Sequence, residues 1–281
     1  MTGRPLVVKF GGELLEEPSR LKVVVGAMCR VAARTPLVIV HGGGKEIDAA
    51  LKVAGIEKRQ VDGLRITDEP TLDVVVAVLA GRVNTRLVAA LGTAGVNAVG
   101  LTGADGNCGL SDPAPPHHGV DGSIVDLGRV GIPSDGADVA VLVALMGRGF
   151  VPTIASIGVG GDGRLFNVNA DTFAGHLAAR LGAVRLVIAG TTPGVLDEDG
   201  RTIEVLEPPA IDRLIGGRTA TAGMIAKLRA CEHALANGVG DVVIADGRDQ
   251  DGLEAAALGS APKGATRLES AGIRPAWKAQ V

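Results

Sequence analysis

Hydrophobic and polar positions follow two alternating patterns along most of the chain. Short β-branched runs at 6–10 and 37–40 are each followed by a stretch in which apolar residues recur every three or four positions, near 17–33 and from Gly44 to about Gly55. Continuous apolar runs predict strands buried on both faces, and the longer period predicts amphipathic helices. This succession of βαβ units predicts an α/β fold with a mainly parallel central sheet.

The same alternation continues to about residue 245, with one interruption. We predict further helices over 71–94, 137–147, 171–181 and 223–237, and further strands over 98–101, 151–157, 184–189 and 241–245. Between 107 and 136 the pattern gives way to Pro, Gly, His and Asp, with a candidate strand at 123–129, which indicates an excursion at the rim of the sheet. No repeat or linker separates independent domains, so we expect one domain with two lobes on a continuous sheet.

Composition excludes several classes of partner. The 281 residues are 46% apolar and carry a net charge of −3 with scattered Lys and Arg, so they offer no basic face for nucleic acid. No apolar run approaches the roughly 18 residues of a membrane span, and no signal-peptide core precedes the first strand. We therefore expect no membrane partner and a cytoplasmic location.

Cysteine and histidine spacing predicts no metal centre. Cys29, Cys108 and Cys231 are widely separated and lack CxxC spacing, so neither a zinc site nor a disulfide framework is indicated. His117 and His118 lie in the Pro-rich excursion without Asp, Glu or Cys at ligand spacing. We expect no metal ion held by a protein cluster.

Three glycine-rich segments lie where predicted strands end. They read KFGG at 9–12, HGGG at 41–44 and GLTGADG at 100–106. Ligands of open α/β sheets bind beyond the carboxyl ends of the strands, where glycine lets backbone N–H groups approach an anion, and HGGG also opens a helix. Turn formation alone could explain any one segment, but three together indicate an anion site.

Two common nucleotide motifs do not describe this site. Residues 158–163 match GxGxxG, but 164–168 has the pattern of a returning hairpin strand instead of the helix that a dinucleotide fold needs. No GxxxxGK[ST] sequence is present, so the chain has no P-loop. Any ATP site is built differently.

Several charged and polar residues have both a functional and a structural interpretation. Lys9 ends a buried strand, where an ammonium needs an anionic partner unless its side chain extends to solvent. Lys227 lies early in a helix, where the dipole disfavours a cation, although it could occupy a solvated face. Asp171 could cap the helix that it begins, and His41 could be either a general base or a buried strand-end histidine.

The ordered motifs resemble the amino-acid kinase family over about residues 6–247. They are VVKFGG (7–12), VIVHGGG (38–44), GLRITD (63–68), SIGVGGDGRLFNVNAD (156–171), GVLDEDG (194–200) and GMIAKL (223–228). The resemblance implies an open αβα sandwich, with an acyl-amino-acid-binding lobe at 1–172 and an ATP-binding lobe at 173–281.

The resemblance also implies roles for individual residues. Lys9 and Lys227 are the expected cations on the transferring phosphoryl group, and Asp171 the carboxylate that orients both. The expected phosphate-binding residues are Gly11, Gly12 and Gly43, and the expected acceptor-binding residues are Gly43, Gly44, Arg65 and Asn167.

The implied reaction is phosphorylation of the side-chain carboxylate of N-acetylglutamate by ATP with Mg²⁺, in arginine biosynthesis. The alternatives are a related kinase for free glutamate, or for glutamate or aminoadipate linked to a carrier protein, and a regulatory binding protein that has lost catalysis. Arginine-inhibited relatives form a hexamer through an extra N-terminal helix, for which a first strand at residue 6 leaves no room. We therefore expect a homodimer without that regulation.

Overall fold

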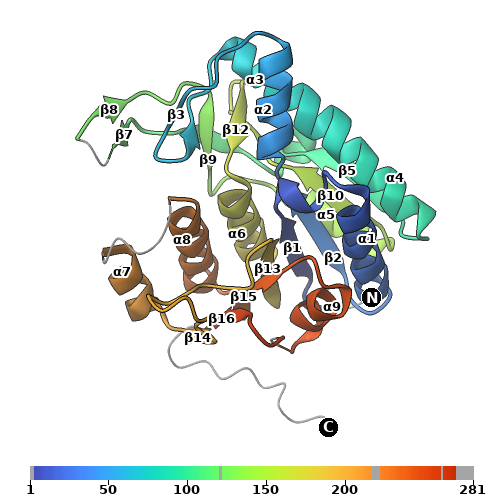
Figure 1. Ribbon diagram of the computed structural model, residues 1–281. Coiled ribbons are helices and arrows are strands. Elements are labelled where there is room, and N and C mark those ends of the chain that lie inside the picture. Colours follow the sequence, from blue (N-terminus) through green and yellow to red (C-terminus); the bar gives the residue numbers. More distant parts are fainter. Residues whose placement is uncertain (1–2, 120–121, 217–221, 261, 270–281) are drawn as a thin grey trace.

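A mainly parallel sheet of eight strands runs through the computed structural model, which describes residues 3–119, 122–216, 222–260 and 262–269 (Figure 1). The predicted lobe ranges include a few residues outside this description, at 1–2, 120–121, 217–221, 261 and 270–281. In spatial order the strands are β14 (Val205–Leu206), β16 (Thr266–Leu268), β15 (Asp241–Asp246), β13 (Arg185–Gly190), β1 (Leu6–Phe10), β2 (Leu37–His41), β10 (Val151–Ala155) and β5 (Ala98–Thr102).

Strand β1 occupies the middle of this sheet. It pairs in parallel with β13 on one side and with β2 on the other, so that Phe10 lies opposite both Ala189 and His41. The β15–β16 pair is antiparallel, and the other pairs of the main sheet are parallel. The carboxyl ends of β1, β2 and β13 therefore meet at one edge, where the glycine-rich segments begin.

Two layers of helices cover the sheet, which confirms the expected αβα sandwich. One layer contains α1 (Pro18–Ala32), α9 (Gln250–Leu258) and the continuous run α3 (Glu69–Val76), η2 (Ala77–Asn84) and α4 (Thr85–Thr93). The other contains α5 (Ala140–Gly147), α6 (Ala170–Arg180) and α8 (Ala222–Ala236), with α7 (Pro208–Gly216) against α8. The predicted helices and strands of residues 6–55 and 137–189 all form, with ends shifted by a few residues.

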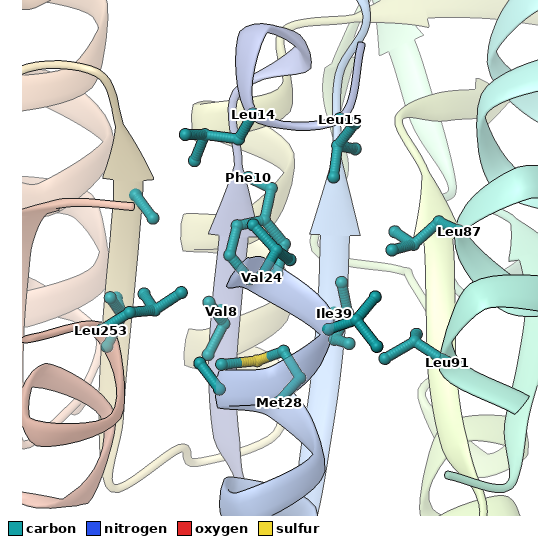
Figure 2. Close-up of a cluster of buried hydrophobic side chains, with 14 of the residues drawn as sticks. Val8, Phe10, Leu14, Leu15, Val24, Met28, Ile39, Leu87, Leu91 and Leu253 are labelled. Atoms are coloured by element: carbon teal, nitrogen blue, oxygen red, sulfur yellow. The ribbon is translucent and has the colours of Figure 1, made fainter. Parts of the chain in front are cut away.

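The alternation of β1 decides which side chains face which layer. Val8 and Phe10 belong to the buried cluster beneath α1, where Figure 2 shows them with Val24 and Met28. Val7 belongs to the opposite cluster, beneath α6 and α8. Because side chains of a strand alternate between faces, Lys9 shares the face of Val7 and points toward α6 and α8.

A smaller sheet and two hairpins form the rim above the carboxyl edge (Figure 1). The candidate strand at 123–129 is shorter than predicted, and the hairpin predicted over 158–168 is confirmed because β11 and β12 pair antiparallel. The strands are β11 (Ile157–Val159), β12 (Leu165–Val168), β9 (Val130–Pro133) and β6 (Ser111–Pro113) in the sheet, and the pairs β3 (Gln60–Val61) with β4 (Leu64–Arg65) and β7 (His117–His118) with β8 (Ile124–Val125).

The helical run Glu69–Thr93 departs from the sequence expectation in two ways. Its middle is π-helical at Ala77–Asn84, and Nδ2 of Asn84 donates to the carbonyls of Leu101 at 2.8 Å and Thr153 at 3.1 Å. The run of 25 residues, with a mean hydropathy of 1.7, has the length and composition of a membrane span. The prediction that no apolar run approaches such a length is therefore wrong. In the fold, however, one side of the run packs on the sheet as part of the buried core.

The C-terminal elements α7, α9, β14 and β16 were not predicted. Each is short, and the two strands contain two and three residues, too few for a periodic signal. Helix α9 has a local signal in Asp249, whose side chain accepts from the backbone N–H groups of Asp251 and Gly252.

A buried ion pair joins the starts of β13 and β15. Arg185 lies opposite Asp241, and its Nε and Nη2 atoms donate to the two carboxylate oxygens at 2.6 Å each. Both residues are at most 4% exposed, and Arg267 also donates to Asp241 at 3.0 Å. The bidentate pairing satisfies charges that would otherwise be desolvated without compensation.

We expect Asp241→Asn to lower the free energy of unfolding by about 3–5 kcal/mol, because Arg185 would remain buried without its countercharge. Urea unfolding measures this change. Asp199→Asn is the matched control, since Asp199 forms an exposed pair with Arg201. Equal stability of the two variants would show that the buried pair is dispensable.

Candidate active site

A cavity of about 290 Å³ opens at the carboxyl edge of the sheet. It is lined by eight of the nine residues predicted for the site: Lys9, Gly11, Gly12, Gly43, Gly44, Arg65, Asn167 and Asp171. These residues come from β1, the β2–α2 junction, β4, β12 and the start of α6. The ninth residue, Lys227, does not line this cavity and approaches from α8.

Two glycine segments touch each other at the floor of the cavity. A methyl group on Gly12 would lie 2.6 Å from Cα of Gly43, and one on Gly43 would lie 2.8 Å from a methyl carbon of Leu79. Neither position has space for a side chain. Gly43 is also the N-cap of α2 (Gly44–Val53), whose first-turn N–H groups have no partners within the helix and can bind an anion.

Lys9 and Asp171 form a buried ion pair beside these glycines. The distance from Nζ of Lys9 to Oδ1 of Asp171 is 2.7 Å, and each residue is 7% exposed. Burial alone would raise the pKa of Asp171, but the positive charges of Lys9 and Lys227 bring it below its ordinary value. Asp171 is therefore an ionised carboxylate that pairs with Lys9 and is influenced by the charge of Lys227.

The alternative interpretation of Asp171 as a helix cap is wrong. Asn169 is the N-cap of α6, and its Oδ1 accepts from the backbone N–H groups of Asp171 at 2.9 Å and Thr172 at 3.1 Å. Because Asn169 satisfies the start of the helix, the carboxylate of Asp171 is available to Lys9. The sequence signal was present in NVNAD, since Asn is as good a cap as Asp.

Lys227 approaches the same centre from α8. Burial lowers its pKa, and the charge of Lys9 acts in the same direction, while Asp171 and Glu13 oppose the shift. A methyl group on Gly190 would lie 3.7 Å from Nζ of Lys227, which places this ammonium at the end of β13. Lys9, on β1, and Lys227, beside the end of β13, thus both lie near Asp171.

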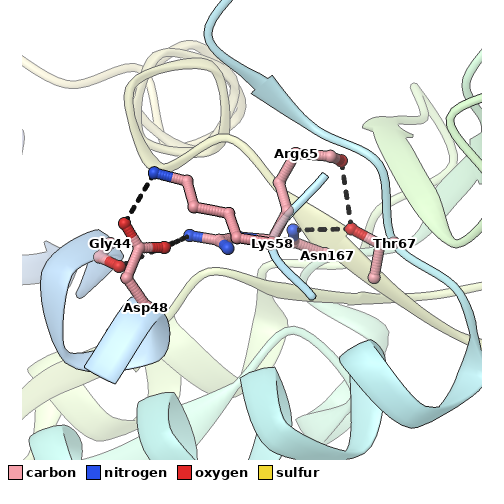
Figure 3. Close-up of polar contacts among 6 residues, drawn as sticks. All are labelled: Gly44, Asp48, Lys58, Arg65, Thr67 and Asn167. Atoms are coloured by element: carbon pink, nitrogen blue, oxygen red, sulfur yellow. Dashed lines mark hydrogen bonds and ion pairs between the residues drawn. The ribbon is translucent and has the colours of Figure 1, made fainter. Parts of the chain in front are cut away.

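Arg65 is held in place by Asp48, an acidic residue that was not predicted to belong to the site (Figure 3). It forms an ion pair with Asp48 of α2, and Asp48 also accepts from Nζ of Lys58 at 2.7 Å. Burial would raise the pKa of Asp48, but hydrogen bonds from Lys58 and Arg65 lower it. Nη1 of Arg65 is buried, and no acceptor among the described residues reaches it, so it can bind a ligand oxygen.

Asn167 joins the acceptor side of the cavity through Thr67. Its Nδ2 donates to Oγ1 of Thr67 at 3.1 Å, and Thr67 donates to the carbonyl of Arg65 at 3.1 Å (Figure 3). This chain ties β12 to the strand that carries Arg65. Asn167 and Arg65 therefore line the cavity as linked neighbours.

The histidines near the site contribute no base. His41 is fully buried, and burial lowers its pKa to about 4, so it is neutral and inaccessible at neutral pH. His117 bonds to Asp62 at 2.8 Å, which connects the β7–β8 hairpin to the β3–β4 turn. In the part of the chain that the structure describes, no three His, Cys, Asp or Glu side chains could together hold a metal ion.

The assembled site is suited to bringing two anions together. Lys9, a helix N-terminus and glycine backbone groups line the cavity together with Arg65 and Asn167, and the charge of Lys227 acts on Asp171 from outside this lining. Such donors stabilise charge on a transferring phosphoryl group. The same features suit a nucleotide phosphate at the lysines and an acceptor carboxylate at Arg65.

Comparison with known proteins agrees with this geometry. The model of the Amino acid kinase family matches residues 4–246. Acetylglutamate kinase of Novosphingobium aromaticivorans is 41% identical over 257 residues, covering 88% of this chain and 84% of that protein. Acetylglutamate kinase of Methylobacillus flagellatus is 37% identical over 261 residues, covering 89% and 85%.

The fold is also shared with a solved kinase structure. Carbamate kinase from Giardia lamblia bound to AMP-PNP superposes with a TM-score of 0.69 at 17% identity, covering 96% of this chain and 99% of that one. At this identity the likeness concerns the fold alone. The family match over most of the chain, together with the two close relatives, shows that the chain belongs to the amino acid kinase family.

Proposed function

We propose that this protein transfers the γ-phosphoryl group of ATP to the side-chain carboxylate of N-acetylglutamate, a step of arginine biosynthesis. The observation that carries the proposal is the buried set of Lys9, Asp171 and Lys227 beside a glycine-lined cavity. The relatives named acetylglutamate kinase share about 40% of their residues with this chain over most of its length, which favours this acceptor over glutamate alone or glutamate and aminoadipate on a carrier protein. The intact charged set also argues against a regulatory protein without catalysis.

The reaction needs electrostatic compensation more than it needs a base. A side-chain carboxylate with an ordinary pKa of about 4.3 is ionised at neutral pH and can attack directly. The obstacle is repulsion between that carboxylate and the phosphates. Lys9 and Lys227 offset this charge, and Asp171 keeps both ammonium groups in place. The backbone N–H groups of Gly12 and Gly43 bind phosphate oxygens, whereas the N–H of Gly11 donates to the carbonyl of Ala189.

Arg65 is the proposed anchor of the acceptor. Its Nη1 atom has no acceptor within the described part of the chain, and a guanidinium binds carboxylates with well-defined geometry. Gly44 and Asn167 line the same wall. We propose that this wall holds acetylglutamate in the lobe formed by residues 1–172, and that residues 173–281 hold ATP with its Mg²⁺.

The cellular setting is a prediction from the sequence. The absence of a basic face and the small-molecule substrates favour a cytoplasmic biosynthetic enzyme. The homodimer expected from the resemblance remains a prediction, which light scattering tests.

Product formation across a panel of acceptors tests the function. The protein should release ADP and form a hydroxylamine-trappable acyl phosphate with N-acetyl-L-glutamate. Free glutamate and carrier-protein-linked glutamate or aminoadipate should give much less product. Absence of turnover with N-acetyl-L-glutamate, under conditions where another acceptor reacts, would replace our choice with that acceptor.

Lys9→Ala and Lys227→Ala should each lower kcat by about 10²–10³-fold, the usual effect of removing one charge-stabilising donor from an active site. Each protein should remain folded by circular dichroism. Lys52→Ala is the matched control because Lys52 is exposed on α2. Unchanged kcat in either active-site variant would remove that lysine from the phosphoryl-transfer centre.

Arg65→Ala should raise KM for N-acetylglutamate by about 10–100-fold, since a charge-assisted hydrogen bond contributes about 1.5–3 kcal/mol. KM for ATP should change much less. Arg59→Ala is the control, because Arg59 is exposed and pairs with Asp68 outside the cavity. An equal rise in both KM values would indicate a general distortion instead of a lost acceptor contact.

A further inference from the structure

The carboxylate of Glu13 occupies the phosphate end of the site but has no role in the scheme above. Glu13 lies in the short helix η1 (Gly12–Leu14), directly after the glycines of β1, and its side chain lines the cavity. A methyl group on Gly11 would collide with both carboxylate oxygens of Glu13, so the carboxylate lies against that backbone. Its position is therefore inside the proposed phosphate cradle.

The same carboxylate also reaches the end of the neighbouring strand. A methyl group on Gly190 would lie 3.3 Å from Oε1 of Glu13 and 3.7 Å from Nζ of Lys227. Strands β1 and β13 are joined here because the N–H of Gly11 donates to the carbonyl of Ala189 at 3.0 Å. Glu13 thus lies across two strand ends, next to the lysine that approaches from α8.

Glu13 changes the charge of the centre. Lys9 and Lys227 carry two positive charges and Asp171 one negative charge, which leaves a net charge of +1. With Glu13 the four side chains sum to zero. A neutral centre offers no net attraction to the phosphates of ATP, and the carboxylate itself repels them at short range. A further cation is needed for the phosphates and Glu13 to lie side by side.

The pairing of Glu13 differs from that of a neighbouring carboxylate. Among the described residues Glu13 forms no side-chain ion pair, whereas nearby Glu17 pairs with Arg20 at 3.3 Å. A carboxylate that lines a phosphate site and lacks a cation of its own is the kind of oxygen ligand that Mg²⁺ takes together with nucleotide phosphates.

We propose that Glu13 binds the Mg²⁺ that ATP brings, directly or through a coordinated water, and so makes the site selective for MgATP over free ATP. The inference rests on the proposed function, since it requires ATP to bind at the ends of β1 and β13. Beside the two lysines, the phosphate end then has a third functional residue, which contacts the metal. This role explains why an acidic side chain lies among groups that otherwise attract phosphate.

Nucleotide affinity measured without turnover tests this role. Titration calorimetry gives the Kd of ATP in excess Mg²⁺ and in EDTA. The wild-type protein should bind MgATP more tightly than free ATP. Glu13→Gln should bind free ATP more tightly and MgATP more weakly than wild type, so that the ratio of the two Kd values falls by about tenfold or more. Glu17→Gln should leave the ratio unchanged.

Manganese provides a second measurement that a structural role would not alter. Electron paramagnetic resonance of Mn²⁺ with ATP and protein should show a different bound-metal spectrum for Glu13→Gln than for wild type, and Glu13→Asp should retain part of the wild-type signal. Circular dichroism establishes that each variant is folded.

Three results would overturn the proposal. If Glu13→Gln tightens both forms of ATP by the same factor, Glu13 only repels phosphate and occupies the empty cradle. If neither the Kd ratio nor the manganese spectrum changes, Glu13 does not contact the metal. If the wild-type protein binds no MgATP at all, the proposed function fails together with this inference.

Discussion

The buried ion pair between Lys9 and Asp171 is the interaction on which the site depends. It joins the central strand to a helix that begins more than 160 positions later in the sequence, and both side chains are almost fully buried. Two charges can be desolvated in this way only when they compensate each other. The alternation of β1 turns Lys9 toward α6, and Asn169 caps that helix so that Asp171 is free to pair. The proposed position of phosphoryl transfer depends on both local features, the orientation of Lys9 and the cap at Asn169.

Close backbone packing complements this charge pair. Gly12 and Gly43 bring the ends of β1 and β2 so near each other that neither accommodates a side chain, and the N-terminus of α2 opens at the same point. Backbone N–H groups then form the wall next to Lys9. Fixed donors of this kind need little reorganisation when charge develops, which is the property that phosphoryl transfer requires.

Acidic residues orient the cationic side chains of the site and offset part of their charge. Asp48 holds Arg65 and leaves its Nη1 atom without an acceptor among the residues that the structure describes, while Asp171 pairs with Lys9 under the influence of Lys227. Glu13 brings the charge of the phosphate end to zero, which makes a metal ion part of the proposed nucleotide complex. An acidic neighbour therefore restricts the orientation of each of these cations. Ligand binding then depends on the donor atoms that the ion pairs leave unused.

The sequence by itself determined the fold class, most of the αβ order, and Lys9 with the glycine-rich segments that line the cavity, because strand and helix periods and glycine-rich strand ends are local signals. Asp171 and Lys227 could also be singled out from the sequence, each with a structural alternative, and the resemblance then selected Arg65 and Asn167 and implied the roles of all these residues. The hydrophobic pattern did not predict the short C-terminal elements or the π-helical segment. Contacts with neighbouring segments, and not a hydrophobic period, determine the conformation of these residues. Only the tertiary structure showed that Asn169 instead of Asp171 caps α6, that Asp48 holds Arg65, and that Glu13 lies between Gly11 and Gly190. These contacts depend on which distant segments the sheet brings together. The sequence of one segment does not determine which side chains of another segment will lie beside it.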